Sequence, residues 1–270
     1  MKKILLINDV VGYSHVGMVA MMPILTYLGH HTFNLPTALV SNTLDYGHFN
    51  VLETTEYMRG TIPVWERLGF GFDAACTGLT FGEEQTRIVI DYCNRLHRGG
   101  TTIFVDPIMG DGGRLYNGIS HRQVELMREM VSISDLTFPN YTEACYLTDT
   151  PYRQDGIAWE DACHMLNHIA GLGARSVLIT SAHVDGQSCV IGLEHGTKNY
   201  FKLDYDEIPV AFHGTGDIFS AVLIGHLMNG KPLQASTQNA MTVVSDLINR
   251  NRCLADKLGG IPIEQCLDLL

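Results

Sequence analysis

The chain has 270 residues, of which 46% are hydrophobic and 17% are charged, and its formal net charge is −11. This composition excludes a disordered chain, because disorder requires low hydrophobicity together with high charge. The acidic balance excludes a nucleic-acid surface or a polybasic membrane face, since both need clustered Lys and Arg. A small anionic ligand remains compatible with it, because such a ligand needs only a local site of positive potential.

A long segment without charge lies near the N-terminus, where no Asp, Glu, Lys or Arg occurs between Val10 and Leu44. Glycines, prolines and histidines interrupt it, so it lacks the roughly 20 consecutive apolar residues that span a membrane. We expect buried strands and a buried helix here, with part of the segment forming a wall of a ligand pocket. The apolar run at residues 4–7 is too short for a signal peptide, which predicts a cytoplasmic protein.

Short apolar runs alternate with longer amphipathic stretches along the chain. Strands are predicted at residues 4–7, 32–35, 74–77, 103–106, 136–138 and 176–180. Helices are predicted at residues 18–28, 54–68, 83–97, 121–133, 141–148, 159–172, 217–228 and 233–252. Two further runs, 187–193 and 198–203, are predicted as an antiparallel pair joined by a turn at 194–196. The alternation predicts one α/β domain, residues 1–270, built on a mostly parallel sheet.

Ligands in open α/β sheets bind at the carboxyl ends of the strands, so the polar residues that follow each apolar run are the informative ones. One such segment is Gly214-Thr215-Gly216-Asp217, which precedes an apolar helix. Its glycines allow backbone N–H groups to converge at a helix N-terminus, which is a binding site for phosphate. Asp217 is then either an ordinary acidic residue of a first helical turn or a general base for an attacking hydroxyl.

A second segment runs from Asp106 to Tyr116 and contains three glycines. Asp106 and Asp111 suit Mg²⁺ bound through water, although a glycine-rich turn with solvated carboxylates explains the same pattern. In a third segment, Asn140 and Glu143 have the spacing of a capping box at a helix start. Their place after a predicted strand also suits contact with Mg²⁺ or phosphate.

Taken together in this order, these segments resemble the ribokinase-like superfamily and, within it, most closely the pyridoxal kinases. The similarity extends over essentially the whole chain and also includes the segments 4–17, 40–48, 76–78 and 179–181. It implies an α/β fold, a three-layer α/β/α sandwich with a mostly parallel central sheet and no separate lid domain. It also implies ATP-dependent phosphorylation of the 5'-hydroxymethyl group of a B6 vitamer, with ATP and Mg²⁺ as cofactors and a homodimer as the assembly.

The resemblance also implies residue roles. Asp217 is the catalytic base, and the amides around Gly214, Thr215 and Gly216 form the anion hole. Asp106 and Glu143 would act on the Mg²⁺ side, and Tyr116 would lie on the lid loop. The residues implied to contact ATP are Asp111, Asn140, Thr180, Ser181 and Thr215.

The chain departs from the pyridoxal kinases at Asp9, usually Ser, at Thr43-Leu44, usually His-Thr, and at Leu79, usually a Tyr that stacks on the pyridine ring. These positions belong to the substrate pocket, so we expect Asp9, Leu44, Leu79 and Asp217 to contact the acceptor. Asp9 suits a cationic group, such as the amine of pyridoxamine or a protonated ring nitrogen.

Two alternatives remain open at this point. One is a kinase for hydroxymethylpyrimidine or another small hydroxymethyl heterocycle, although the related hydroxymethylpyrimidine kinases usually carry Cys where this chain has Asp217. The other is a non-catalytic nucleotide-binding regulator, which the presence of Asp217, Asp106 and Glu143 disfavours.

Overall fold

The computed structural model describes residues 1–196 and 199–270, and packing divides the chain into two compact units. Unit 1 consists of Met1–Phe81 and Ile208–Leu270, and unit 2 of Gly82–Glu207. The single domain expected from the sequence stays a prediction. Among the described residues, no helix combines the length and the apolarity that crossing a membrane requires.

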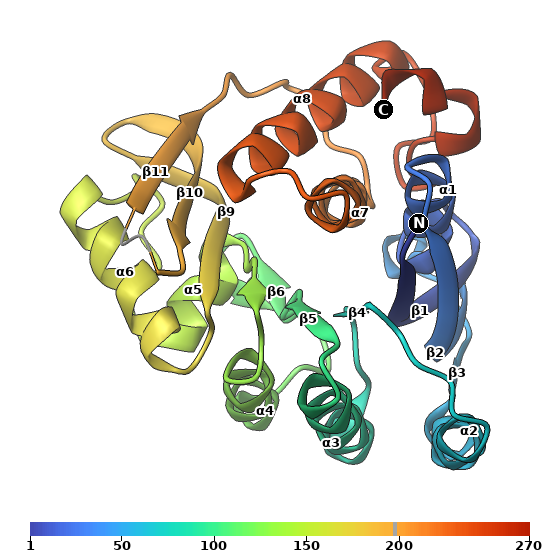
Figure 1. The fold of residues 1–270 in the computed structure, drawn as a ribbon. Coiled ribbons are helices and arrows are strands. Elements are labelled where there is room, and N and C mark those ends of the chain that lie inside the picture. The colour runs from blue at the N-terminus through green and yellow to red at the C-terminus, as the bar shows by residue number, and fades with distance from the viewer. Residues whose placement is uncertain (197–198) are drawn as a thin grey trace. The chain divides into compact units, whose positions relative to one another are not determined.

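Unit 1 contains a twisted sheet with the strand order β4-β1-β2-β3. Its strands are β1 (Lys3–Tyr13), β2 (His31–Asn42), β3 (Val51–Glu53) and β4 (Ala74–Thr77). Its helices are α1 (Met18–Tyr27), α2 (Thr55–Arg67), α7 (Thr215–Met228) and α8 (Leu233–Asn251), with the 3-10 helices η1 (Leu44–Tyr46), η2 (Ile263–Gln265) and η3 (Leu267–Leu269). Strand β1 pairs in parallel with β2 and β4, whereas β3 is antiparallel to β2. Helices α1, α7 and α8 pack against one another in a row (Figure 1).

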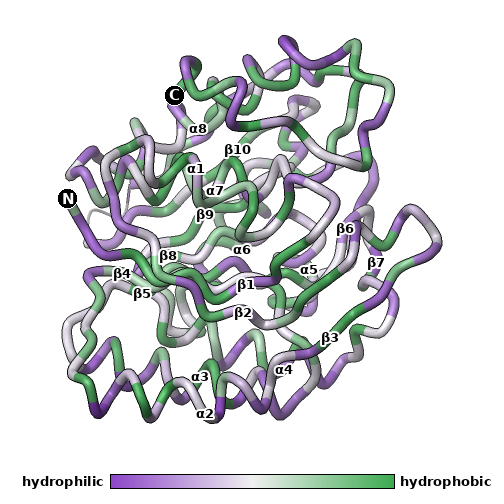
Figure 2. Tube along the Cα trace, turned by 90° about the vertical axis from the view of Figure 1, so that its right-hand side faces the viewer, coloured by the Kyte–Doolittle hydropathy of each residue, from purple (hydrophilic) through white to green (hydrophobic). Residues whose placement is uncertain are grey.

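The centre of unit 1 is apolar, as the hydrophobic runs predict. The side chains of residues 4–7 in β1 are completely buried, and so are Met18, Ile24 and Leu25 in α1. Helix α7 is buried along nearly its whole length from Ile218 to His226. Helix α2 lies at the surface instead, and Figure 2 shows hydrophilic and hydrophobic residues alternating along it.

The pairing of β1 with β2 is irregular beside Asp9. The register shifts between Asn8 and Val10, where Asn8 lies opposite Pro36. Proline has no N–H to donate to the ladder, so regular pairing is interrupted at this point. Such an irregularity changes the direction in which neighbouring side chains point and is common next to functional sites.

The charge-free segment is only partly buried, which corrects the expectation that its strands lie in the core or line a pocket. Val11, Ala38 and Val40 form a buried cluster, but the alternate residue Leu39 is 47% exposed. In the sheet Leu39 pairs with both Val10 of β1 and Leu52 of β3, and Leu52 is 60% exposed. Since side chains alternate between the two faces of a strand, these three side chains share one outward face. The absence of charge therefore also marks an apolar surface, which we call the Leu39 row (Val10, Leu39 and Leu52).

Unit 2 contains the strand order β5-β8-β9-β10-β11 and a separate hairpin of β6 and β7. The strands are β5 (Thr102–Val105), β6 (Gly110–Asp111), β7 (Arg114–Leu115), β8 (Leu136–Thr137), β9 (Ser176–Val184), β10 (Gln187–Glu194) and β11 (Asn199–Asp204). The helices are α3 (Gly82–Arg98), α4 (His121–Val131), α5 (Tyr141–Thr148) and α6 (Trp159–Gly171). Strands β5, β8 and β9 are parallel, and β9, β10 and β11 are antiparallel.

The predicted helices agree with the structure to within about two residues at each end, as is usual for helix limits. The predicted antiparallel pair corresponds to β10 and β11, although the predicted start of the second run, Lys198, lies outside the described residues. The predictions ended β1, β2 and β9 too early and missed the short strands β3, β6 and β7. Polar residues such as Asn8 and Asp9 suggested the end of β1, yet they continue the strand because their side chains are buried in a hydrogen-bonded cluster.

Candidate active site

Asp217 lies in the first turn of α7, as predicted, directly after the glycine-containing turn. Gly214 has a φ of 81°, in the left-handed region that favours glycine. A Cβ atom on Gly214 would lie 2.4 Å from the carbonyl oxygen of His15, so the turn also depends on close backbone contact. The first N–H groups of the helix have no partner within it and point away from its N-terminus, which creates a site of positive potential.

Two hydrogen bonds within unit 1 hold the Asp217 carboxylate. The amide N of Gly17 donates to Oδ2 over 2.8 Å, and Nδ2 of Asn8 donates to Oδ1 over 3.3 Å. Burial raises the pKa of Asp217, and the two hydrogen bonds oppose this effect. A carboxylate that is held in a fixed orientation and has a raised pKa is suited to accept a proton.

Asp9 is a second buried carboxyl group in the same unit, with only 8% of its surface exposed. A Cβ atom on Gly17 would lie 2.6 Å from Oδ1 of Asp9, so the backbone of Gly17 packs against Asp9 while its amide binds Asp217. Burial, followed by repulsion from Asp217, raises the pKa of Asp9 to about 7. The departure at Asp9 therefore introduces a group that changes its charge near neutral pH.

The other two residues expected in the acceptor pocket occupy different settings. The amide N of Leu79 donates to Oδ1 of Asn8 over 2.9 Å. Because Asn8 also binds Asp217, Leu79 is connected to the Asp217 carboxylate through one side chain. Leu44 begins η1 and is 47% exposed. Oδ2 of its neighbour Asp45 lies 3.4 Å from Nε2 of His213, the residue before Gly214. The structure thus connects Asp9, Leu79 and Asp217 through Asn8 and Gly17, whereas Leu44 itself has no described contact with them. Contact of the four residues with an acceptor stays a prediction.

In unit 2, the first turn of α5 holds the glycine-rich hairpin. Nδ2 of Asn140 donates to the carbonyl oxygen of Gly110 over 2.9 Å, and the amide N of Gly113 donates to Oγ1 of Thr142 over 2.9 Å. The amide N of Met109 donates to Oε1 of Glu143 over 2.9 Å. The second and third segments singled out in the sequence therefore form one connected structure.

The capping box at α5 is present, since Asn140 accepts from the amide N of Glu143 and Oε2 of Glu143 accepts from the amide N of Asn140. Glu143 is buried, which raises its pKa to about 8 against the effect of the amides of Met109, Asn140 and Gly110. Both of its carboxylate oxygens thus accept backbone hydrogen bonds. The predicted action of Glu143 on the side of Mg²⁺ stays a prediction. In the structure, Glu143 caps α5 and holds the backbone of Met109.

Asp106 follows β5 directly and is partly exposed, and Asp111 lies exposed in the hairpin. No group of three His, Cys, Asp or Glu suited to a metal occurs within residues 1–196 and 199–270. Mg²⁺ bound together with ATP needs only one or two carboxylates, because phosphate and water supply its remaining oxygen ligands. The oxygen donors of Asp106 and Asp111 therefore fit this ion.

Three predicted nucleotide-side residues remain in unit 2. The amide N of Thr180 donates to the carbonyl oxygen of Pro139 over 2.9 Å, which places Thr180 beside the start of α5. Ser181 has a φ of 53°, a conformation that is uncommon for a residue other than glycine and often marks a functional site. Tyr116, 46% exposed, follows β7, and its amide N donates to the carbonyl oxygen of Met109.

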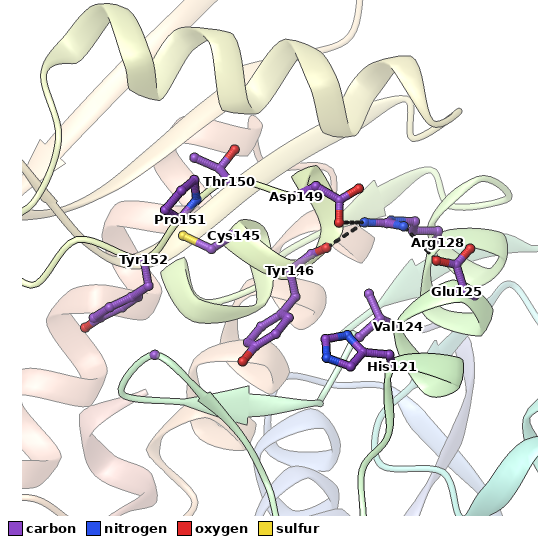
Figure 3. A pocket seen from close by; sticks show the side chains of 11 residues that line it. His121, Val124, Glu125, Arg128, Cys145, Tyr146, Asp149, Thr150, Pro151 and Tyr152 are labelled. Atoms are coloured by element: carbon purple, nitrogen blue, oxygen red, sulfur yellow. Dashed lines mark hydrogen bonds and ion pairs between the residues drawn. The ribbon is translucent and has the colours of Figure 1, made fainter.

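A cavity of about 390 Å³ lies beside the hairpin, between α4 and the end of α5 (Figure 3). Arg128 lies in its wall, where its guanidinium donates to the carbonyl oxygens of Leu147 and Tyr146 and forms ion pairs with Glu125 and Asp149. The two carboxylates balance the charge of this cation, and the two carbonyl oxygens fix it to the C-terminal end of α5. Arg128 is therefore not available to bind an anion in the cavity. It instead caps the C-terminal end of α5.

We expect Arg128→Met to lower the free energy of unfolding by about 1–3 kcal/mol, because two partly buried carbonyl groups lose a charged donor. Urea unfolding followed by circular dichroism measures this change. The matched control is Arg59→Met, which removes an exposed ion pair with Glu56 on α2 and should cost less than about 1 kcal/mol. Equal losses in both variants would contradict the capping role of Arg128.

The sequence assigns no role to three residues that contribute to these hydrogen-bonded groups. Asn8 and Gly17 bind the Asp217 carboxylate across about two hundred residues of sequence, and Thr142 binds Gly113. Asn8 was detectable as a polar residue after an apolar run, but a single sequence does not reveal its partner. Gly17 and Thr142 lie within segments that carry the resemblance, but nothing in the sequence indicates their hydrogen-bond partners.

The comparison with known proteins agrees with this geometry. Residues 17–261 match the family described as phosphomethylpyrimidine kinase. The chain belongs to this family. Among individual relatives, the pyridoxal kinase of Rubrobacter xylanophilus is 30% identical over 247 residues, which cover 86% of this chain and 81% of the relative. These relatives are kinases, which confirms the predicted enzyme class.

Solved structures extend the comparison. A Bacteroides thetaiotaomicron protein, provisionally described as a phosphomethylpyrimidine kinase and crystallised with pyridoxal, is 32% identical with a TM-score of 0.93. That alignment covers 99% of this chain and 95% of the other. The pyridoxal kinase from Lactobacillus plantarum is 24% identical with a TM-score of 0.89, over 99% of this chain and 96% of the other, and it shows the shared fold. The α/β fold class and the resemblance to the pyridoxal kinases are thereby confirmed.

Proposed function

We propose that this chain transfers the γ-phosphoryl group of Mg·ATP to the 5'-hydroxymethyl group of a B6 vitamer: pyridoxal, pyridoxine or pyridoxamine. The observation that carries the proposal is the Asp217 carboxylate, held by Gly17 and Asn8 at the N-terminus of α7 beside the turn at Gly214. A base and an anion site share one helix end, and phosphoryl transfer to an alcohol needs both. The pyridoxal kinase names of the relatives and the pyridoxal in the Bacteroides structure support the choice of acceptor.

In this mechanism the hydroxyl group of the acceptor donates its proton to Asp217 as it attacks phosphorus. The backbone amides of Gly214, Thr215 and Gly216 stabilise the negative charge of the group being transferred. Asp9, Leu44 and Leu79 contact the acceptor ring and its substituents. The remaining catalytic effect comes from positioning, because phosphoryl transfer requires little covalent chemistry from the protein.

We assign ATP binding to Asp111, Asn140, Thr180, Ser181 and Thr215, and the lid over the phosphates to the loop that carries Tyr116. Asp106 and Glu143 act on the side of Mg²⁺, which would neutralise charge on the phosphates when bound. The fixed hairpin supports this assignment, because Asn140, Thr142 and Glu143 hold its backbone in one conformation.

Hydroxymethylpyrimidine is the alternative acceptor, and the name of the matched family favours it. A panel of pyridoxal, pyridoxine, pyridoxamine and hydroxymethylpyrimidine, followed by coupled release of ADP, separates the two activities. We expect kcat/KM to be highest for a B6 vitamer. A higher value for hydroxymethylpyrimidine would reject the proposed acceptor, and ATP binding without release of ADP on any alcohol would indicate a non-catalytic regulator.

We further propose that the protein acts in the cytoplasm as a homodimer and that the Leu39 row faces the second copy. The row combines Leu39 and Leu52, which are 47% and 60% exposed, with Val10 on the adjacent strand. Exposed apolar groups that adjoin one another usually mark a surface that a partner covers. A second copy of the same chain presents the same row, which suits a self-complementary interface.

Leu52→Asp is expected to convert the dimer into a monomer, because a charge would be buried at the centre of the interface. Light scattering after size-exclusion chromatography measures the mass of each species. The matched control, Val64→Asp, places a charge at an exposed position of α2 and should leave a dimer. A wild-type monomer, or a dimer that persists in Leu52→Asp, would reject this interface.

A further inference from the structure

Asn8 occupies a central position among the functional groups of unit 1, although it is not itself expected to touch a substrate. It is 3% exposed and lies at the irregular pairing of β1 with β2. Its Nδ2 donates to Oδ1 of Asp217 over 3.3 Å. Its Oδ1 accepts from the amide N of Leu79 over 2.9 Å and from the amide N of Asp9 over 3.0 Å. One side chain thus contacts the base and the backbone of two proposed acceptor residues.

Close packing fixes the orientation of the Asn8 side chain. A Cβ atom on Gly78 would lie 2.3 Å from Oδ1 and 2.6 Å from Nδ2 of Asn8, so the backbone of Gly78 lies directly against the amide group. The orientation of the amide also follows from its partners, because the backbone N–H groups of Leu79 and Asp9 require an acceptor and the Asp217 carboxylate requires a donor. An exchange of the amide oxygen and nitrogen would break all of these contacts.

We propose that Asn8 is a positioning residue for phosphoryl transfer, which holds the Asp217 carboxylate and the Leu79 backbone in a fixed relation to each other. This inference rests on the proposed function of Asp217 as the base. A rigid connection keeps the base within reach of the acceptor hydroxyl, since small errors in position greatly reduce the rate of such reactions. The role differs from that of Gly17, whose amide binds Asp217 but has no contact with the Leu79 backbone among the described hydrogen bonds.

The electrostatic surroundings of Asp217 make the role measurable. Burial raises the pKa of Asp217, whereas the hydrogen bonds from the amide N of Gly17 and from Nδ2 of Asn8 lower it. Helix α1, which packs against α7, carries no acidic or basic side chain. Removal of the Asn8 amide should therefore raise the pKa of Asp217 and move the acid limb of the kcat/KM profile to higher pH.

The test compares wild type, Asn8→Leu, Asp217→Ala and the double variant in the presence of the best B6 vitamer. We expect Asn8→Leu to lower kcat/KM by about 10- to 100-fold, with its acid limb at higher pH and with unchanged affinity for ATP. In the Asp217→Ala background, Asn8→Leu should change the rate less than threefold, because its effect passes through the base. Full additivity of the two losses, or an unmoved acid limb, would overturn the proposal.

A matched control and a second measurement separate this inference from the function on which it rests. Asn251→Leu removes another buried asparagine of unit 1, which binds Leu247 and Cys266, and should lower stability without moving the acid limb. Carbon NMR of the Asp217 carboxyl group follows its titration without turnover and should show a higher pKa in Asn8→Leu. A wild-type protein inactive on every vitamer would reject the proposed function. An Asp217 titration that does not move would reject the role of Asn8 in either case.

Discussion

Replacement of Asp217 by Asn or Ala is expected to lower kcat by about 10²–10⁴, the range that general-base catalysis contributes. In Asp217→Asn the new side-chain oxygen would still accept a hydrogen bond from the amide of Gly17, so the fold around the helix end should persist. The amide group has no basic oxygen for the proton of the acceptor hydroxyl, and the loss should therefore affect turnover rather than ATP binding. Steady-state kinetics with a B6 vitamer and calorimetric titration with a non-hydrolysable ATP analogue measure the two quantities separately.

The control for this substitution is Asp246→Asn, which changes an exposed carboxylate on α8 and should leave kcat within about twofold. A kcat of Asp217→Asn equal to that of the control would show that Asp217 is only an acidic residue at a helix start. That interpretation was open from the sequence. The partly buried setting of the carboxylate and its two amide donors favour the base, because an exposed helix-start aspartate needs neither.

The sequence predicted most of the secondary structure because local patterns determine it. The limits of α5 were predicted to the residue, since Asn140 and Glu143 form a capping box that needs no distant partner. The turn at Gly214 was also predicted, because two glycines before an apolar helix have a local geometric meaning. The α/β fold class follows from the alternation of these local elements.

The missed features all depend on contacts between distant parts of the chain. The strand β1 continues past Asn8 because that polar side chain is satisfied by Asp217 and Leu79, and neither partner is visible locally. The exposure of Leu39 was missed for the same kind of reason, since an apolar residue in a strand has the same pattern whether a core or a second chain covers it. The raised pKa of Asp9 likewise requires its burial and the nearby Asp217 to be known.

Asp9→Asn is expected to stabilise the fold, and the gain should increase with pH. The pKa of Asp9 is about 7 in the folded chain and 3.8 in the absence of the fold. Between these values the folded chain binds a proton that the unfolded chain has released, so stability falls as pH rises through this window. Above about pH 7 the ionised carboxyl group is retained in a buried site beside Asp217, and its destabilising effect is complete.

The difference in free energy of unfolding between Asp9→Asn and wild type should increase by about 2 kcal/mol from pH 5.5 to pH 8. Urea unfolding at a series of pH values measures this difference. Asp155→Asn, in an exposed turn of unit 2, is the matched control and should show a difference that does not vary with pH. Parallel stability curves for Asp9→Asn and wild type would contradict a raised pKa at Asp9.

A residue that destabilises its own fold is usually retained for function. For Asp9, the function we consider is selection of the acceptor. If ionised Asp9 pairs with a cationic group of the acceptor, a bound pyridoxamine or protonated ring offsets the cost of the buried charge. Asp9→Ser should then lower kcat/KM for pyridoxamine about tenfold more than for pyridoxine, as expected when a buried ion pair is lost. Wild type that uses all three vitamers equally, with ratios unchanged in Asp9→Ser, would leave Asp9 as a buried carboxyl group without a role in selectivity.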